Sequence, residues 1–217
     1  CAARLEREPF EQAVYSDLGF MALGHLVERV TNQPLDRFVA AELFPALDLP
    51  SLHFRPLASP LQSPAPLVAT GVCRPREPAP GQEALLPAPD PTRPPRARAG
   101  EVDDDNAFAL GGVAGHAGLF GCARDVAAFG NALLEELGGA SRVGPPSLWM
   151  AFCTRDATTP RSSRALGFDT PSGDHPACGR HLSLSRTVGH TGFTGTSLFV
   201  DLDRKLSVAL LTNRTHP

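Results

Sequence analysis

The 217-residue chain is 42% hydrophobic and carries 23 acidic against 20 basic residues, for a formal net charge of −3. This length and apolar content are sufficient for the core of one domain, and the scattered charges form neither the basic patch of a nucleic-acid-binding protein nor a polybasic membrane patch. No apolar stretch approaches the ~20 residues that a membrane-spanning helix needs, so we expect no membrane segment in this chain.

The start of the chain indicates missing coding sequence rather than a targeting signal. The chain does not begin with methionine, its first residues do not resemble a signal peptide, and its first motif follows within fifteen residues. We therefore expect coding sequence upstream. The cysteines are widely spaced and form no C-x-x-C pair, which predicts isolated thiols rather than a zinc or dithiol site. They are Cys1, Cys73, Cys122, Cys153 and Cys178.

The first predicted element is a helix from Leu18 to Val30. Its apolar residues form two adjoining stripes that leave little of its surface polar, so we expect a mostly buried helix. Ser16 or Asp17 is predicted to cap its first turn, because short side chains with an oxygen accept from the free backbone N–H groups there. Asp17 therefore has a purely structural interpretation as well.

A second helix is predicted to start at Gln33-Pro34 and to end at Pro45. Its expected inner face consists of Leu35, Phe38, Val39 and Leu43. The range 50–95 then holds 13 of the 22 prolines, and residues 74–98 have almost no periodicity. This composition predicts an extended surface excursion at about 50–99, within one domain that covers residues 1–217.

Residues 100–118 combine acidic residues with a glycine-rich stretch, in which glycine allows close backbone approach and positive φ. The acidic residues and a following histidine could coordinate a hard cation, but their spacing lacks the glycine and the distal glutamate of a calcium loop. These residues are Glu101, Asp103, Asp104, Asp105 and His116. We favour a solvated acidic turn and predict no metal site.

The second half of the chain contains the clearest periodic segments. Residues 123–137 read as an amphipathic helix that Gly138-Gly139 stops, and a short helix is expected around Trp149. Residues 186–192, 196–202 and 206–212 read as three strands, the last two joined by a polar hairpin at 203–205. Helices followed by a meander predict an α+β fold in which an antiparallel sheet packs against helices.

Two short segments carry candidate chemistry for acyl transfer. Tyr15 precedes the first helix, where its phenol could act as a base beside a cation, although a packed aromatic is the simpler interpretation. His190-Thr191-Gly192 lies on the first strand of the meander, and Gly192 would let a ligand approach the backbone. The N–H of Phe193 is then a candidate oxyanion donor, although a glycine turn alone would explain the pattern.

Together, Tyr15-Ser16-Asp17 and residues 189–195 resemble the second and third motifs of class C β-lactamase-like and penicillin-binding-protein-like serine hydrolases. The resemblance spans nearly the whole chain and is weakest at 56–99. It implies a β-lactamase/transpeptidase-like fold, incomplete at the N-terminus, with no cofactor and with a small-molecule or peptide acyl substrate.

The same resemblance implies a role for each motif residue. Tyr15 would be the general base and Asp17 a polar group that orients the substrate. His190 and Thr191 would contact the substrate carboxylate or carbonyl, with Gly192 beside them. The Phe193 N–H would form half of the oxyanion hole, and the serine nucleophile would supply the other half.

The chain departs from this family at three points. The chain contains no Ser-x-x-Lys motif, because its single lysine is Lys205 and the residue three positions before it is Leu202, not serine. Asp17 replaces the usual asparagine, which disfavours anionic substrates unless a cation offsets its charge. His190 replaces the usual lysine, so carboxylate binding there would require a protonated histidine. The last two differences point towards an esterase or peptidase-like relative.

We therefore predict a serine hydrolase that acts on an ester, amide or lactam through an acyl-enzyme, with the chain as given inactive because it lacks the nucleophile. A non-catalytic binding module for a peptide or cell-wall ligand is the alternative. A third possibility is a fragment that does not fold stably, because three strands without neighbours leave a bare edge.

Overall fold

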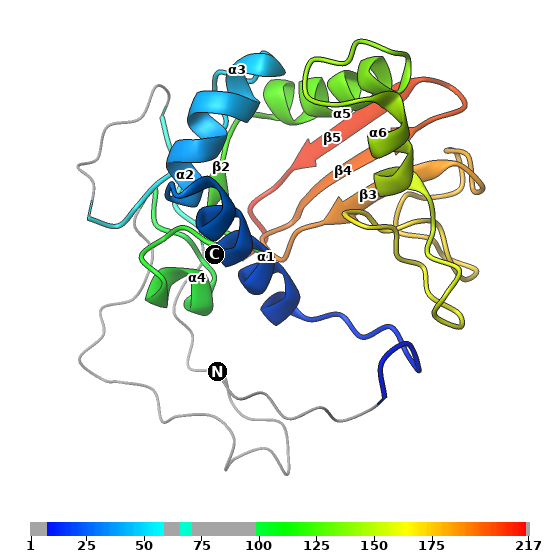
Figure 1. The fold of residues 1–217 in the computed structure, drawn as a ribbon, viewed down its shortest axis with the longest axis horizontal. Helices are drawn as coiled ribbons and strands as arrows, with labels where there is room; N and C mark the ends of the chain where they lie inside the picture. Colours follow the sequence, from blue (N-terminus) through cyan, green and yellow to red (C-terminus); the bar gives the residue numbers. More distant parts are fainter. Residues whose placement is uncertain (1–7, 59–65, 71–98, 216–217) are drawn as a thin grey trace.

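The computed structural model describes residues 8–58, 66–70 and 99–215, so most of the predicted excursion at 50–99 lies outside the described residues. Figure 1 shows helices grouped beside a three-stranded sheet. In chain order the helices are α1 (Asp17–Thr31), α2 (Leu35–Phe38), the π-helix η1 (Val39–Leu43), α3 (Phe44–Ala46), α4 (Asp105–Ala109), α5 (Ala123–Leu137) and α6 (Pro146–Cys153). The strands are β1 (His53–Phe54), β2 (Leu119–Phe120), β3 (Thr187–Thr191), β4 (Thr196–Asp201) and β5 (Leu206–Leu211).

Strands β3, β4 and β5 form the predicted antiparallel meander, in that order. Helix α5 packs against β4 and β5, and α6 packs against α5 (Figure 1). The core between them contains Leu133 of α5, Cys153 of α6, Val188 of β3 and Val200 of β4, all buried. The predictions of an α+β architecture, of the three strands and of the helix at 123–137 are thus confirmed.

Helix α1 is present, but the prediction that it is mostly buried is wrong. Gly24 is its one buried residue; Met21 and Val27 are half-buried, and five other large apolar side chains are at least 40% exposed. They are Leu18, Phe20, Leu23, Leu26 and Val30. Two apolar stripes predict burial only if elements cover both, and within residues 8–58, 66–70 and 99–215 each stripe is covered only in part. The capping prediction also fails, because Ser16 occupies the N-cap position without a side-chain hydrogen bond.

The second predicted helix does not end at Pro45. Instead α2 continues through the π-helical turn η1 into α3, and the helical stretch ends at Ala46, one residue beyond Pro45. Leu35 of the predicted inner face is buried, and Phe38, Val39 and Leu43 are half-buried. The pairing of β1 with β2, with His53 opposite Phe120, was not predicted, because two-residue strands leave no period to read.

The glycine-rich stretch packs closely against α1, as its composition predicts. Gly111, Gly112 and Gly118 have positive φ, and a Cβ atom on Gly115 would overlap the carbonyl oxygen of Phe20. Gly24 meets the same loop from the helix side. Close contact between Gly24 and Gly115 therefore holds the middle of α1 against residues 111–118.

Replacing Gly115 with alanine is expected to destabilise the fold by about 1–3 kcal/mol, because the added methyl group collides with backbone that cannot move independently. Urea unfolding followed by circular dichroism measures this loss. Gly19→Ala is the matched control, since a Cβ there meets nothing within 4 Å and alanine favours the helix. Equal midpoints for the two variants would contradict the tight packing of α1 on the loop.

Within the described part of the chain, no helix combines the length and the apolar character that crossing a bilayer requires.

Candidate active site

The two predicted motifs, which lie far apart in the sequence, meet in the structure. Tyr15 immediately precedes α1, and the centroid of its ring lies 5.8 Å from that of His190 on β3. Tyr15 is 62% exposed, so its phenol is open to solvent rather than enclosed in a core. The interpretation of Tyr15 as a simple packed aromatic is therefore weakened.

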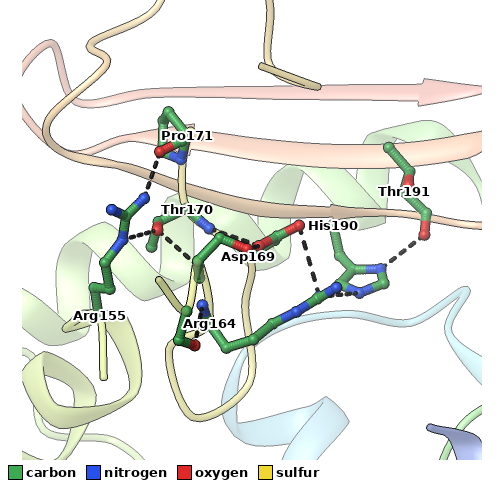
Figure 2. A network of polar contacts seen from close by, with 9 residues as sticks. Arg155, Arg164, Asp169, Thr170, Pro171, His190 and Thr191 are labelled. Atoms are coloured by element: carbon green, nitrogen blue, oxygen red, sulfur yellow. Dashed lines mark hydrogen bonds and ion pairs between the residues drawn. The ribbon is translucent and has the colours of Figure 1, made fainter. Parts of the chain in front are cut away.

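His190 has both ring nitrogens engaged, and the partners determine where its hydrogen lies (Figure 2). Nη1 of Arg164 lies 3.3 Å from Nε2, and because arginine can only donate, Nε2 must accept. Nδ1 lies 2.7 Å from the carbonyl oxygen of Thr191, so Nδ1 must donate. This arrangement corresponds to the tautomer with its single hydrogen on Nδ1.

Arg164 also contacts the other members of this group. Its Cζ lies 5.2 Å from the centroid of the Tyr15 ring, which is a cation–π distance. Its Nη1 lies 3.6 Å from Oδ2 of Asp169, in an ion pair whose two side chains are about one third exposed. A guanidinium therefore links Tyr15, His190 and Asp169 at the predicted site.

The position of Arg164 is set by a loop that docks on the outer edge of β3 (Figure 2). Asp169 exchanges both backbone hydrogen bonds with Gly189, at 2.7 and 3.0 Å. Inside the loop, Ser163 Oγ donates to Asp169 Oδ1 at 2.7 Å, and Thr170 Oγ1 donates to the carbonyl oxygen of Ser163 at 2.7 Å. The guanidinium is thus carried on ordered backbone.

Arg155 supports the same loop from the far side. Its Nε donates to Thr170 Oγ1 at 2.7 Å, and its Nη2 donates to the carbonyl oxygen of Pro171 (Figure 2). Two arginines therefore serve different purposes in this network, because Arg155 is bound to the loop and Arg164 points towards the motifs.

The remaining residues of the third motif lie at the end of β3 and in the β3–β4 turn. Thr191 is exposed, and Phe193 is 64% exposed with its carbonyl oxygen accepting from Arg214 Nε at 2.7 Å. Gly192 was predicted to make room for a ligand. In the structure a glycine is needed at position 192 for packing within the β3–β4 turn, because a Cβ atom there would overlap Oγ1 of Thr196. The roles of Thr191, Gly192 and Phe193 stay predictions.

Asp17 meets two of the residues considered as a cation site. Asp104 Oδ1 accepts from the N–H of Ala107 at 2.7 Å and from His116 Nε2 at 2.8 Å, and an Asp17 carboxylate oxygen lies within 4.8 Å of these groups. Burial raises the pKa of Asp104, but the hydrogen bonds from Ala107 and His116 outweigh this effect, so the pKa is lowered overall.

The prediction of a solvated acidic turn therefore needs correction at Asp104, which caps α4 and binds the His116 side chain, itself only 4% exposed. Two carboxylates and an imidazole are groups that can act as ligands of a divalent cation. The hydrogen bond between Asp104 and His116 explains why these two side chains lie close together without a metal. The expectation that no metal binds here stays a prediction.

Sequence reasoning missed Arg164. Nineteen of the twenty basic residues are arginine, and Arg164 belongs to no motif. Its importance comes from the pairing of Asp169 with Gly189, which no local pattern reveals. The glycine at position 189 is the one indirect signal, because it marks a close approach of backbone at the edge of β3.

Comparison with known proteins places these features in a family. The sequence model of a family described as Beta-lactamase matches residues 1–217. A protein from Escherichia coli O157:H7 named "Putative D-alanyl-D-alanine carboxypeptidase" is 33% identical over 224 residues, which cover 98% of this chain and 47% of that protein. The chain thus spans about half the length of the curated relatives it matches.

Solved structures show the same fold at lower identity. A beta-lactamase from Mycobacterium bovis matches with a TM-score of 0.59 and 16% identity, covering 95% of this chain and 58% of that one. An octameric penicillin-binding protein homologue from Pyrococcus abyssi matches with a TM-score of 0.63 and 14% identity, covering 95% of this chain and 40% of that one.

Proposed function

The chain belongs to the beta-lactamase family, and we propose that it forms the Tyr-x-Asp and His-Thr-Gly walls of a serine hydrolase that removes the C-terminal residue of acyl-peptides through an acyl-enzyme. The observation that carries this proposal is the meeting of Tyr15, His190 and Arg164 at the end of β3. The carboxypeptidase name of the Escherichia coli relative supports the choice of a peptide substrate.

In this proposal the nucleophile is a serine hydroxyl outside these 217 residues, on a Ser-x-x-Lys motif. Tyr15 takes the hydroxyl proton as the serine oxygen attacks the scissile carbonyl, and it gives the proton to the leaving amine. The N–H groups of Phe193 and of the serine hold the oxyanion. Water then attacks the acyl-enzyme along the same route and releases the shortened peptide.

Asp17 would face the substrate from the first turn of α1. A carboxylate accepts hydrogen bonds but cannot donate them, so Asp17 suits an N–H of the peptide rather than its carbonyl oxygen.

Covalent labelling tests the proposal. The 217-residue chain is expected to remain unlabelled by a fluorescent penicillin or an activated ester, because it lacks the nucleophile. The same chain extended by a Ser-x-x-Lys segment encoded upstream of the Cys1 codon is expected to be labelled on that serine and to release D-alanine from acetyl-D-alanyl-D-alanine.

Two outcomes would overturn the proposal. One is labelling of Ser16, Ser197 or another serine of the 217-residue chain. The other is an extended protein that folds but is neither labelled nor hydrolytic, which would favour the binding-module alternative. If the extended protein is labelled by penicillin on that serine but does not hydrolyse the peptide, the acyl-enzyme part of the proposal stands and the peptide substrate is rejected.

A further inference from the structure

We infer that Arg214 is a positioning residue for the proposed oxyanion hole, because its side chain holds the backbone of Phe193, whose N–H is the proposed oxyanion donor. The inference rests on the proposed hydrolase function and adds to it a residue that belongs to neither motif. Arg214 has no contact with the substrate in this assignment. It acts through the β3–β4 turn, which consists of residues 192–195.

The direction of the Phe193 N–H follows from the hydrogen bonds of the β3–β4 turn. The Gly192 N–H donates to the carbonyl oxygen of Thr196 at 2.6 Å, and the Gly195 N–H donates to the carbonyl oxygen of Gly192 at 3.0 Å. The Gly192 carbonyl and the Phe193 N–H belong to one peptide group, and in a planar trans peptide they point in opposite directions. The Phe193 N–H is therefore directed away from Gly195 and out of the turn.

The peptide group on the other side of Phe193 is held by the Arg214 side chain. Nε of Arg214 donates to the carbonyl oxygen of Phe193 at 2.7 Å, and Cζ lies 5.4 Å from the centroid of the Phe193 ring, which is a cation–π distance. The φ and ψ angles of a residue are fixed when the peptide groups on both sides of it are fixed. Arg214 thus supplies the second of the two hydrogen bonds that fix the Phe193 backbone.

The segment that follows β5 holds Arg214 beside this turn. The Arg214 N–H donates to the carbonyl oxygen of Thr194 at 3.0 Å, and the N–H and Oγ1 of Thr212 donate to that of Gly195 at 3.2 and 2.6 Å. Gly195 has a φ of +94°, and a Cβ atom there would overlap Thr212 Oγ1 and lie 3.2 Å from Arg214 Cγ. Arg214 therefore reaches Phe193 from backbone that is itself anchored to the turn.

This hydrogen bond should matter more for catalysis than for stability. It lies at the exposed surface, where the loss of one contact changes the free energy of unfolding little. An oxyanion donor, in contrast, accelerates the reaction only when it is already aimed at the position that the oxyanion will occupy. A small displacement of such a group lowers the rate even when the substituted residue lies away from the reacting atoms.

Arg214→Met in the extended protein tests the inference, because methionine keeps an unbranched apolar stem and removes the donor. We expect kcat and kcat/KM for an activated ester to fall together by about 10- to 100-fold, with KM unchanged, since the oxyanion forms only in the transition state. A boronic acid forms a tetrahedral adduct with the serine that resembles this state. Its inhibition constant should rise by a similar factor.

Two further variants separate position from charge and from general surface effects. Arg180→Met is the matched control, because Arg180 Nη2 also donates to a backbone carbonyl, that of Asp174, at 3.1 Å and at the exposed surface. It should keep the wild-type kcat. Arg214→Lys keeps the positive charge but loses the planar donor at Nε, so we expect it to lose activity in the same direction as Arg214→Met.

Amide hydrogen exchange gives a second readout in the 217-residue chain, where no serine nucleophile is needed. The Gly195 N–H, which is bound to the Gly192 carbonyl, should exchange about 5- to 10-fold faster in Arg214→Met, because the turn opens more readily. The amides of α5 should keep their protection, since α5 does not contact the turn through any hydrogen bond given for Arg214.

The inference is overturned if folded Arg214→Met keeps the wild-type kcat, if Arg214→Lys is fully active, or if Gly195 exchange is unchanged. Any of these results with an active wild-type enzyme leaves the hydrolase proposal standing. An extended wild-type protein that folds but does not hydrolyse the ester would reject the proposed function, and with it this role of Arg214.

Discussion

Replacing Tyr15 with phenylalanine is expected to lower kcat/KM by about 10²- to 10⁴-fold in the extended protein that carries its Ser-x-x-Lys segment, as loss of a general base does. The substitution removes only the phenolic oxygen. The ring contact with His190 and the cation–π contact with Arg164 would remain, so the position of both motifs should be unchanged.

Steady-state hydrolysis of an activated ester and of an acyl-peptide measures this effect. Activity is compared with thermal unfolding of the same variant, which should match the wild type because Tyr15 is 62% exposed. Phe10→Leu is the control, since Phe10 is an exposed aromatic residue in the same N-terminal segment. A variant with unchanged kcat/KM would restore the interpretation of Tyr15 as a packing residue.

The elements that could be predicted are those whose signal is local. Helix α5 matches its predicted bounds because one apolar face repeats over fifteen residues and two glycines stop it. The strands of the meander match because β-rich runs alternate with turn residues. Burial of α1 could not be predicted, since it depends on what covers the helix. The π-helical turn within 39–43 could not be predicted either, because its side-chain pattern is that of an ordinary helix.

Some residues of the candidate site could likewise be predicted from local sequence, and others could not. Tyr15 and His190 could be found because short motifs place chemistry beside a helix start and on a strand, and the structure brings the two rings together. Arg164 could not be found, because a loop pairing of Asp169 with Gly189 delivers it. His116 and Asp104 were considered together, yet their hydrogen bond follows from packing of the glycine-rich loop and not from spacing.

Asp201→Asn is expected to destabilise the protein by about 2–4 kcal/mol, because it disrupts a buried carboxylate that is surrounded by donors. Asp201 is fully buried at the end of β4. Its oxygens accept from the backbone N–H groups of Ser183, Asp203 and Arg204, and Nη1 of Arg204 donates at 2.6 Å. An asparagine would turn an NH₂ group towards some of these donors.

The same carboxylate makes stability depend on pH. Burial raises the pKa of Asp201, but the hydrogen bonds and the charge of Arg204 outweigh it and lower the pKa from 3.8 to about 2. Because the folded-state pKa is the lower one, the stabilisation is complete above the unfolded value and is lost as the pH falls from about 4 towards 2. Urea unfolding at pH 6 and pH 3 should show a larger loss of the free energy of unfolding at pH 3 in the wild type than in Asp201→Asn.

Asp203→Asn is the matched control for this prediction. Asp203 is 44% exposed and pairs with Arg186, so its loss should cost less than about 1 kcal/mol. Equal losses of the free energy of unfolding in the two variants would show that the negative charge of the β4–β5 turn is what stabilises the protein, rather than the buried hydrogen bonds to Asp201. If the prediction holds, the consequence reaches the site, because β4 sets the register of β3, where Val200 pairs with Val188 and Leu198 with His190. Weakening the end of β4 would then loosen the strand that holds His190 beneath Arg164.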